Sequence, residues 1–364
     1  MVWIGVGIAV AFVLLIVVRA MMGGDKEVVA AKPAEPIAKP TSKAAAPKLA
    51  TPTGTKPGRR DDDHEPEGTK VASVPPPAVG KAVVKDVALE EQKMRASEGR
   101  SGPDITIDTT VMEDDDPTGP VALILVTAVG RTDAGKRRKH NEDSYLVLPD
   151  HNLFVIADGM GGYAAGEVAS ALATEVISEA YKTDTFVGES DPTRPKRGDE
   201  LVRAIQMSNE AILTQARANE AQHGMGTTLV SCRFSPNKQR VYIAHVGDSR
   251  CYRVRGHEIR QMTQDHTLGA VGITGPAAAK LSRAVGIADT VEVDLAIDHP
   301  QVGDFYMLCS DGLSKMVPDD VICQIVADEP DLDRSCNKLV DTANERGGRD
   351  NITVILIRVE QPIL

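Results

Sequence analysis

The chain contains 364 residues, carries a formal net charge of −11, and is 26% charged and 3% aromatic. This acidic excess argues against nucleic acid as a partner, because general nucleic-acid binding requires clustered lysine and arginine side chains that neutralise phosphates. The five cysteines form no CxxC pair, so neither a zinc motif nor a regular disulfide framework is predicted, and a reducing compartment is favoured.

The first segment, residues 1–22, contains the apolar run 2-VWIGVGIAVAFVLLIVV-18, which is closed by Arg19. At about 1.5 Å per residue, this run is just long enough to cross a hydrocarbon core of roughly 30 Å. A cleavable signal peptide is the alternative, but no basic residue precedes the run and no clear cleavage site follows it. Since lysine and arginine lie on its C-terminal side, we expect a single-pass transmembrane anchor in the inner (cell) membrane, with the rest of the chain in the cytoplasm.

The second segment, residues 23–119, is rich in Pro, Ala, Lys and Glu, as in 31-AKPAEPIAKPTSKAAAPK-48. Such sequences cannot bury enough apolar area to offset their chain entropy, so a disordered linker is predicted. Near its end, 104-DITIDTTVMEDDD-116 places threonines before an acidic run. That pattern allows phosphorylation of the linker, although a solvated charge run is the simpler interpretation.

The third segment, residues 120–364, has the patterns of a globular domain. Apolar runs typical of strands occur at residues 121–129, 144–148, 152–157, 228–234, 241–246, 251–255, 290–295, 304–309 and 352–359. Helical patterns occur at residues 166–182, 199–218, 319–327 and 332–345. Strands arrive in runs and helices in pairs, so we predict an α+β fold, a four-layer αββα sandwich of two antiparallel sheets flanked by helix pairs.

Acidic residues recur at the ends of these predicted strands. Asp158 follows 152-NLFVIA-157 directly and precedes a glycine, which on its own is typical of an ordinary turn. The same kind of position is occupied by Glu142, Asp143, Asp248, Asp311 and Asp350. Since strand ends can converge at one edge of a sandwich, we interpret these residues as a single acidic cluster.

Converging carboxylates raise one another's pKa values unless a cation compensates their charge. Oxygen ligands without a matching His or Cys cluster favour Mg²⁺ or Mn²⁺ over zinc. Two such ions would activate a water molecule and hold a transferring phosphoryl group. Arg138, in 136-KRRKH-140, is placed to bind phosphate oxygens, although most of this basic run is typical of a surface patch.

Six short motifs then occur in a fixed order within residues 121–358. They are 130-GRTDAGKRRKHNEDS-144, 158-DGMGG-162, 226-GTTL-229, 245-HVGDSR-250, 310-SDGL-313 and 350-DNIT-353. By these motifs the chain resembles the bacterial metal-dependent Ser/Thr protein phosphatases of the PPM, or protein phosphatase 2C-like, family. The resemblance implies a central β-sandwich flanked by helix pairs, in agreement with the pattern of predicted elements.

The resemblance also implies a set of metal ligands. Asp158 would bridge two ions, and the carbonyl of Gly159 would bind the second of them. Asp311 and Asp350 would hold the first ion. The glycines after Asp158 would then let the backbone reach a metal and let the following helix pack closely.

The remaining roles implied by the resemblance concern water and substrate. Glu142 and Asp143 would act mainly through metal-bound waters, and Arg138 would hold the substrate phosphate. A hydroxide that bridges the two ions would attack phosphorus in line, without a phosphoenzyme.

Three features depart from the family pattern. Many eukaryotic members carry a general-acid histidine where this chain has Met160, so a metal-bound water is expected to protonate the leaving oxygen, with His266 as a weaker alternative. The segment 265–286 corresponds to the family's flap but is short and Gly/Ala-rich, which leaves the substrate preference open. Some members bind a third ion through the residue equivalent to Asp248; here Lys315 stands where a second carboxylate would be, and it would either pair with Asp248 or point to the solvent.

The expected function is that of a membrane-anchored phosphatase, with two Mn²⁺ or Mg²⁺ ions per site, that hydrolyses phosphoserine and phosphothreonine. Its partners would be phosphorylated proteins and a cognate bacterial Ser/Thr kinase whose action it opposes. Two alternatives stay open: an inactive phosphatase-like module that recruits partners, and a sporulation-type phosphatase that acts on an anti-sigma antagonist. The retained acids and Arg138 argue against the first, and only substrate tests separate the second.

Overall fold

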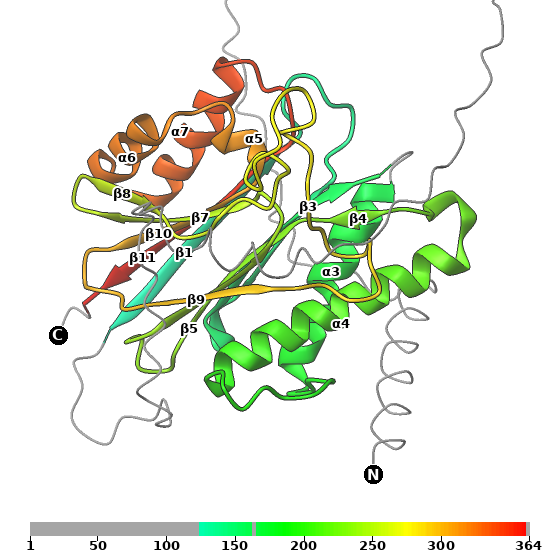
Figure 1. Ribbon diagram of the computed structural model, residues 1–364. Coiled ribbons are helices and arrows are strands. Elements are labelled where there is room, and N and C mark those ends of the chain that lie inside the picture. Colours follow the sequence, from blue (N-terminus) through cyan, green and yellow to red (C-terminus); the bar gives the residue numbers. More distant parts are fainter. Residues whose placement is uncertain (1–123, 162–164, 362–364) are drawn as a thin grey trace, which may run out of the picture. The chain divides into compact units, whose positions relative to one another are not determined.

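Two antiparallel β-sheets are stacked at the centre of the structure, a computed structural model that describes residues 124–161 and 165–361 (Figure 1). The first sheet has the order β1 (Leu125–Asp133), β11 (Ile352–Glu360), β10 (Phe305–Cys309), β7 (Arg250–Arg255) and β8 (Glu258–Gln261). The second has the order β2 (Asp143–Leu148), β3 (Leu153–Met160), β5 (Leu229–Phe234), β6 (Val241–Val246) and β9 (Asp294–Asp298), and the short β4 (Gly226–Thr227) pairs with β3.

Each sheet carries a pair of helices on its outer face. The helices α3 (Ala165–Lys182) and α4 (Lys196–Ala218) share a buried apolar cluster with β3, β5 and β6. On the other side, α6 (Asp319–Asp328) and α7 (Leu332–Glu345) share a second cluster with β7, β10 and β11. A third cluster joins the inner faces of the two sheets. The described residues therefore confirm two antiparallel sheets between helix pairs, as predicted.

The local sequence explains these elements. In α7, Leu332, Cys336 and Leu339 recur at helical spacing and are all buried. The side chain of Asp331 caps this helix by accepting a hydrogen bond from the backbone N–H of Arg334 at 2.9 Å. Strand β10 is apolar throughout because alternate residues serve two different cores, with Tyr306 in the cluster between the sheets and its neighbour Met307 in the cluster under the helices.

Several elements differ from the prediction. Strand β1 continues to Asp133 instead of ending at residue 129, because β11 pairs with all nine of its residues. Strand β9 begins at Asp294 instead of residue 290, since Val291 and Val293 pack into the cluster under α3 and α4. Strand β8 was not predicted; its sequence EIRQ contains one apolar residue and lies at a sheet edge. The short helix α5 (Asp311–Ser314) and the 3₁₀ turns η1 (Pro149–His151) and η2 (Glu220–Gln222) were also not predicted.

The predicted anchor, residues 1–22, and the predicted linker, residues 23–119, lie outside the described residues. Within the described part of the chain, no helix combines the length and the apolar character needed to cross a membrane.

The strand pairing brings several chain ends to one edge of the sandwich. In the second sheet, β2 begins where β3 ends, because Asp143 pairs in register with Asp158. In the first sheet, β10 ends where β11 begins, since Cys309 pairs with Val354. The hydroxyl of Ser310, just after β10, donates a hydrogen bond to Asp143 Oδ2 at 2.9 Å, which joins the edges of the two sheets. The predicted convergence of strand ends is confirmed at this edge.

Candidate active site

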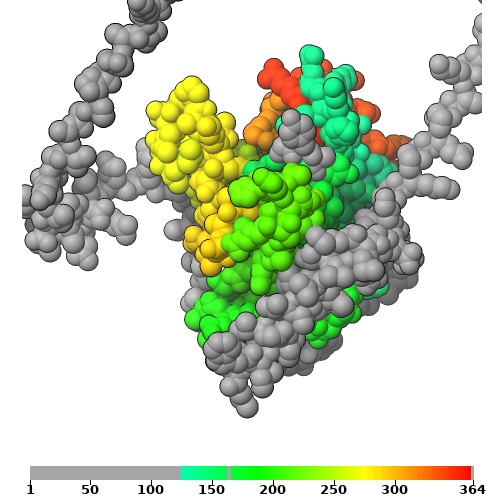
Figure 2. Space-filling view, turned by 90° about the vertical axis from the view of Figure 1, so that its right-hand side faces the viewer, coloured from blue at the N-terminus to red at the C-terminus, as the bar shows by residue number. Residues whose placement is uncertain are grey.

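A cavity of about 340 Å³ opens at this edge of the sandwich. Most of the predicted site residues line it, namely Arg138, Glu142, Asp158, Gly159, Asp248, Asp311 and Asp350, together with Met160 and Lys315. The flap segment, residues 265–286, contributes Ala279 and Leu281 to the opposite wall. In Figure 2 most of this segment is yellow and forms a lobe across a notch from the turquoise loop that contains Arg138.

Asp158 is fixed by backbone contacts at the end of β3. Its carbonyl oxygen accepts a hydrogen bond from the backbone N–H of Thr228 at 2.8 Å and another from the hydroxyl of Thr227 at 2.9 Å. The carboxylate lies in the cavity, beside the residue that pairs with it in register, Asp143. The motif GTTL therefore supplies the support for the strand end on which Asp158 lies.

Asp143 does not line the cavity but lies behind it, with a side chain that is buried. Its Oδ2 atom accepts hydrogen bonds from Ser310 at 2.9 Å and from Thr353 Oγ1 at 2.6 Å. Its Oδ1 atom is buried and has no hydrogen-bond partner among the described residues. One carboxylate oxygen thus positions the loops of both sheets, and the other is left for a ligand.

Two glycines permit the close backbone contacts of the site. A Cβ atom at Gly159 would lie 2.1 Å from the carbonyl oxygen of Gly166 and 2.5 Å from that of Glu142. A Cβ atom at Gly312 would lie 1.9 Å from the carbonyl oxygen of Asn351. These distances are far below van der Waals contact, so the Gly after Asp158 and the Gly after Asp311 are required by packing. The prediction that glycine lets α3 approach the end of β3 is confirmed at Gly159.

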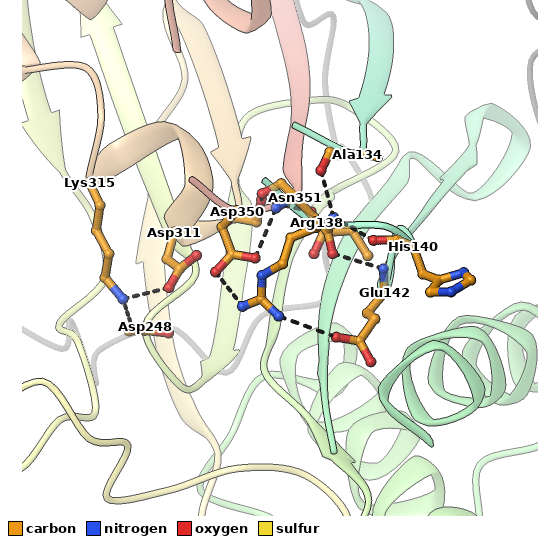
Figure 3. A network of polar contacts seen from close by, with 11 residues as sticks. Ala134, Arg138, His140, Glu142, Asp248, Asp311, Lys315, Asp350 and Asn351 are labelled. Carbon is orange, nitrogen blue, oxygen red and sulfur yellow. Dashed lines mark hydrogen bonds and ion pairs between the residues drawn. The ribbon is translucent and has the colours of Figure 1, made fainter. Parts of the chain in front are cut away.

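Arg138 lies between Asp350 and Glu142, on the side of Asp350 that faces away from Lys315 (Figure 3). Its Nη2 atom is 2.8 Å from Asp350 Oδ2, and its Nη1 atom is 3.7 Å from Glu142 Oε2. The side chain is 47% exposed, so part of the guanidinium faces the open cavity. The predicted position of Arg138 beside the acids is confirmed.

Asn351 connects the loops that carry these side chains, as Figure 3 shows. Its side-chain carbonyl accepts a hydrogen bond from the backbone N–H of Glu142 at 2.9 Å. Its amide group donates to the carbonyl oxygens of Ala134 at 3.0 Å and His140 at 2.9 Å. All hydrogen-bonding groups of this side chain are thereby used, and the loop with Arg138 is tied to the start of β11.

Lys315 forms ion pairs with two carboxylates of the cavity. Its Nζ atom is 3.1 Å from Asp248 Oδ2 and 2.5 Å from Asp311 Oδ2 (Figure 3). Of the two alternatives that the sequence left open for this lysine, the structure selects the pair with Asp248.

The carboxylates of the cluster disfavour one another's ionisation. The pKa of Asp158 is raised well above its ordinary value, first by burial and then by the charges of Asp143, Asp311, Asp350 and Asp248. Burial also raises the pKa of Asp143 to about 7, against the lowering effect of its two hydroxyl partners. The pKa of Asp311 is raised by burial in spite of the nearby Lys315. The site therefore carries negative charge that the protein's own cations do not fully compensate.

His266 lies away from the cavity, contrary to the alternative that made it a general acid. Its ring is buried, with Nδ1 accepting a hydrogen bond from the backbone N–H of Gly247 at 3.1 Å and Nε2 lying 3.2 Å from Asp294 Oδ2. The ring stacks on His245, and these two histidines with Asp294 form a compact group beneath the flap. Burial lowers the pKa of both histidines, that of His245 to about 4.

Five residues that support the site were not identified from the sequence: Thr227, Thr228, Ser310, Asn351 and Thr353. All of them lie within or beside the quoted motifs GTTL, SDGL and DNIT. The motifs were the available signal, because a hydroxyl or amide that bonds to a distant loop produces no periodic pattern. The five cysteines, in turn, are all buried and free in the structure.

Comparison with known proteins agrees with this geometry. Residues 132–356 match the model of the Protein phosphatase 2C family. The chain is 36% identical over 241 residues to the serine/threonine phosphatase stp of Listeria monocytogenes, an alignment that covers 62% of this chain and 93% of that protein. It is 36% identical over 265 residues to the serine/threonine protein phosphatase PstP of Mycobacterium tuberculosis, covering 67% of this chain and 48% of that one.

Solved structures show the same relationship. The catalytic domain of the serine/threonine protein phosphatase PstP, in complex with two manganese ions, superimposes with a TM-score of 0.57 and 34% sequence identity. The match covers 65% of this chain and 99% of that structure. Because the family model spans more than half of the sequence, the chain belongs to the protein phosphatase 2C family and is a bacterial metal-dependent protein serine/threonine phosphatase.

Proposed function

We propose that the acidic cavity is the catalytic centre and that it hydrolyses phosphoserine and phosphothreonine with the help of two divalent cations, Mn²⁺ or Mg²⁺. The observation that carries this proposal is the convergence of Asp158, Asp311 and Asp350 on one cavity, where the ion pairs with Arg138 and Lys315 do not fully compensate the negative charge. Such a cluster is costly for a protein that binds no cation, because each added carboxylate disfavours ionisation of the others.

The donor set fits hard divalent ions. The lining offers carboxylate oxygens and the Gly159 backbone, without a cysteine or histidine, and oxygen ligands of this kind suit Mg²⁺ and Mn²⁺. The buried Oδ1 of Asp143, which has no hydrogen-bond partner among the described residues, is a further acceptor available to the water shell of an ion. We assign Asp158, Gly159, Asp311 and Asp350 to direct contacts and Glu142 and Asp143 to contacts through water. When bound, the ions would supply an activated water and neutralise phosphoryl oxygens.

The protein's own residues then orient the substrate. Arg138, held between Asp350 and Glu142 and still half exposed, presents its remaining N–H groups to two phosphate oxygens. Met160 lines the same cavity and has no proton to donate to the leaving oxygen. No histidine lines the cavity among the described residues, so we expect the proton to come from water, which the open cavity admits.

The cellular setting of this activity is proposed from the sequence. Residues 1–22 would anchor the protein in the inner membrane, residues 23–119 would act as a flexible linker, and residues 120–364 would form the catalytic domain in the cytoplasm. A tether of this length lets the domain reach proteins phosphorylated near the membrane. We infer that a Ser/Thr kinase of the same cell produces these substrates.

The experiment compares Asp158→Asn and Asp311→Asn with the wild type on a phosphothreonine peptide, with Mn²⁺ and with excess chelator. Loss of a buried metal ligand is expected to reduce kcat by a factor on the order of 10³ or more, as for other preorganised electrostatic groups. Asp341→Asn, at an exposed position on α7, is the matched control and should leave turnover unchanged. Full activity of folded Asp158→Asn, or of the wild type in chelator, contradicts the proposal.

A further inference from the structure

Lys315 is the cation that Asp248 contacts in this structure. The Asp248 side chain is 7% exposed, and it forms an ion pair with Lys315 Nζ at 3.1 Å. The same ammonium contacts Asp311, four residues earlier in the chain, at 2.5 Å. Figure 3 shows Lys315 directed from the end of α5 toward both carboxylates. One amino group therefore bridges an acid in the turn between β6 and β7 and an acid at the start of α5.

The position of this amino group limits where a metal ion can bind. A carboxylate offers two oxygens, and at both acids it is Oδ2 that contacts the ammonium. The ammonium does not engage Asp311 Oδ1, which therefore remains available to a cation in the cavity that Asp350 and Asp158 also line. A cation placed between Asp248 and Asp311 would instead meet the ammonium at hydrogen-bonding distance, and two like charges that close repel strongly.

We propose that Lys315 serves as a resident cation of the catalytic cavity: it occupies the place between Asp248 and Asp311, so that Asp248 holds no metal ion. This inference rests on the proposed function, because it concerns the number of ions that the same site binds. The ammonium is part of the chain and needs no recruitment from solution, whereas a metal ion must be bound from a dilute pool. The ions of the site are then confined to the side formed by Asp158, Asp311 and Asp350.

A second consequence concerns affinity. The ammonium shares Asp311 with the ion that this residue holds, so it withdraws part of the negative charge available to that ion. Removal of the ammonium is expected to tighten binding of the retained Mn²⁺ ions by a factor on the order of ten. It also leaves two neighbouring carboxylates without their cation, which should lower the melting temperature of the metal-free protein.

The test counts Mn²⁺ ions per chain by equilibrium dialysis with metal analysis and measures their affinity by calorimetry. We expect two ions for the wild type, two for Asp248→Asn, and three for Lys315→Gln, in which Asp248 becomes available. The double variant Lys315→Gln/Asp248→Asn should return to two. Lys338→Gln, an exposed lysine on α7, is the matched control and should resemble the wild type in both stoichiometry and melting temperature.

The outcomes separate this inference from the proposed function. Three ions in the wild type, with one lost in Asp248→Asn, would overturn the role of Lys315 and leave the metal-dependent mechanism intact. Two ions in folded Lys315→Gln, with unchanged affinity, would overturn it as well. No Mn²⁺ bound by the wild type would instead contradict the proposed function. The comparison of wild type with Asp248→Asn retains Lys315, so it decides the question even if Lys315→Gln does not fold.

Discussion

At the scale of single residues, two cations, Lys315 and Arg138, contact the acids of the cavity. They differ in how many of their N–H groups stay free to bind a substrate. The Lys315 ammonium is committed to two carboxylates, whereas the Arg138 guanidinium has more N–H groups than its contacts with Asp350 and Glu142 use. A planar fork with free donors matches the oxygens of a phosphoryl group, and a single ammonium engaged on both sides does not. Substrate phosphate is therefore expected on the Arg138 side.

Arg138→Ala is expected to raise KM for a phosphothreonine peptide about tenfold and to lower kcat by less than that, because the side chain binds phosphate in the ground state as well as in the transition state. The exposed Arg137, one position earlier, provides the control, since Arg137→Ala removes the same charge from the same loop without a contact to the acids. Equal kinetics for the two variants would show that Arg138 does not bind the substrate phosphate and belongs, like its neighbours, to a basic surface patch.

At the scale of elements, the flap is attached to the site at both of its ends, by His266 at its start and by the backbone pairing of Val285 with Thr227 near its end. The backbone N–H of His266 donates to the carbonyl of Gly247 at 2.9 Å, and its Nδ1 accepts from the N–H of the same glycine at 3.1 Å. Its carbonyl accepts from Ser282, at the other end of the flap, at 2.9 Å. Because Gly247 precedes Asp248, this histidine joins the base of the flap to the loop that Lys315 contacts.

The flap is expected to open in mild acid. Burial lowers the pKa of His266, so the neutral ring is the form that the closed flap stabilises. The stabilisation is complete above the pKa of an unfolded histidine, about 6.5, and is lost as the pH falls toward the lower folded pKa. Protonation of Nδ1 would remove the acceptor for Gly247. The pKa of the neighbouring Asp294 is lowered, because hydrogen bonds from Arg283 and His266 outweigh the effect of its burial, so this carboxylate stays ionised across this range.

Hydrogen exchange of flap amides measures this opening, expressed as protection factors to correct for the intrinsic effect of pH. We expect lower protection at pH 5 than at pH 7.5 in the wild type. His266→Ala should show low protection already at pH 7.5, whereas His266→Asn, whose side-chain oxygen can accept from Gly247, should be insensitive to pH. Protection that is equal at both pH values in the wild type would show that His266 does not control the flap.

The elements also show what sequence can and cannot predict. The acids were located because each one adjoins an apolar run, and runs such as 241–246 became strands with the predicted bounds. The start of β9 was predicted too early because Val291 and Val293 alternate with polar residues as in a strand. In the structure they precede β9 and pack into the apolar cluster under α3 and α4, and the spacing of apolar residues alone does not distinguish these two cases. Asn351 was missed because its partners lie 209 to 217 residues away.

At the scale of the whole molecule, the described fold contains every residue proposed for catalysis, and residues 1–119 are proposed to anchor and tether it. Every residue assigned to the site lies between Arg138 and Thr353, within the described part of the chain. The three apolar clusters of the described chain are built from its own strands and helices. A fragment of residues 120–364 is therefore expected to fold independently.

The last prediction separates anchoring from catalysis. The 120–364 fragment should be recovered from the supernatant after ultracentrifugation and should match the full chain in kcat/KM on a soluble phosphopeptide within about twofold, since a flexible linker changes local concentration rather than chemistry. The full chain should sediment with membranes, and a variant in which an unrelated apolar span replaces residues 2–18 should do the same, because anchoring requires only length and apolarity. A reporter fused after Leu364 should be active in the cytoplasm, as the lysine and arginine residues after the span require. Activity of that reporter only outside the cytoplasm would place the catalytic domain on the other side of the membrane from its expected substrates. A full chain that stays in the supernatant would show that residues 2–18 do not anchor the protein in a membrane.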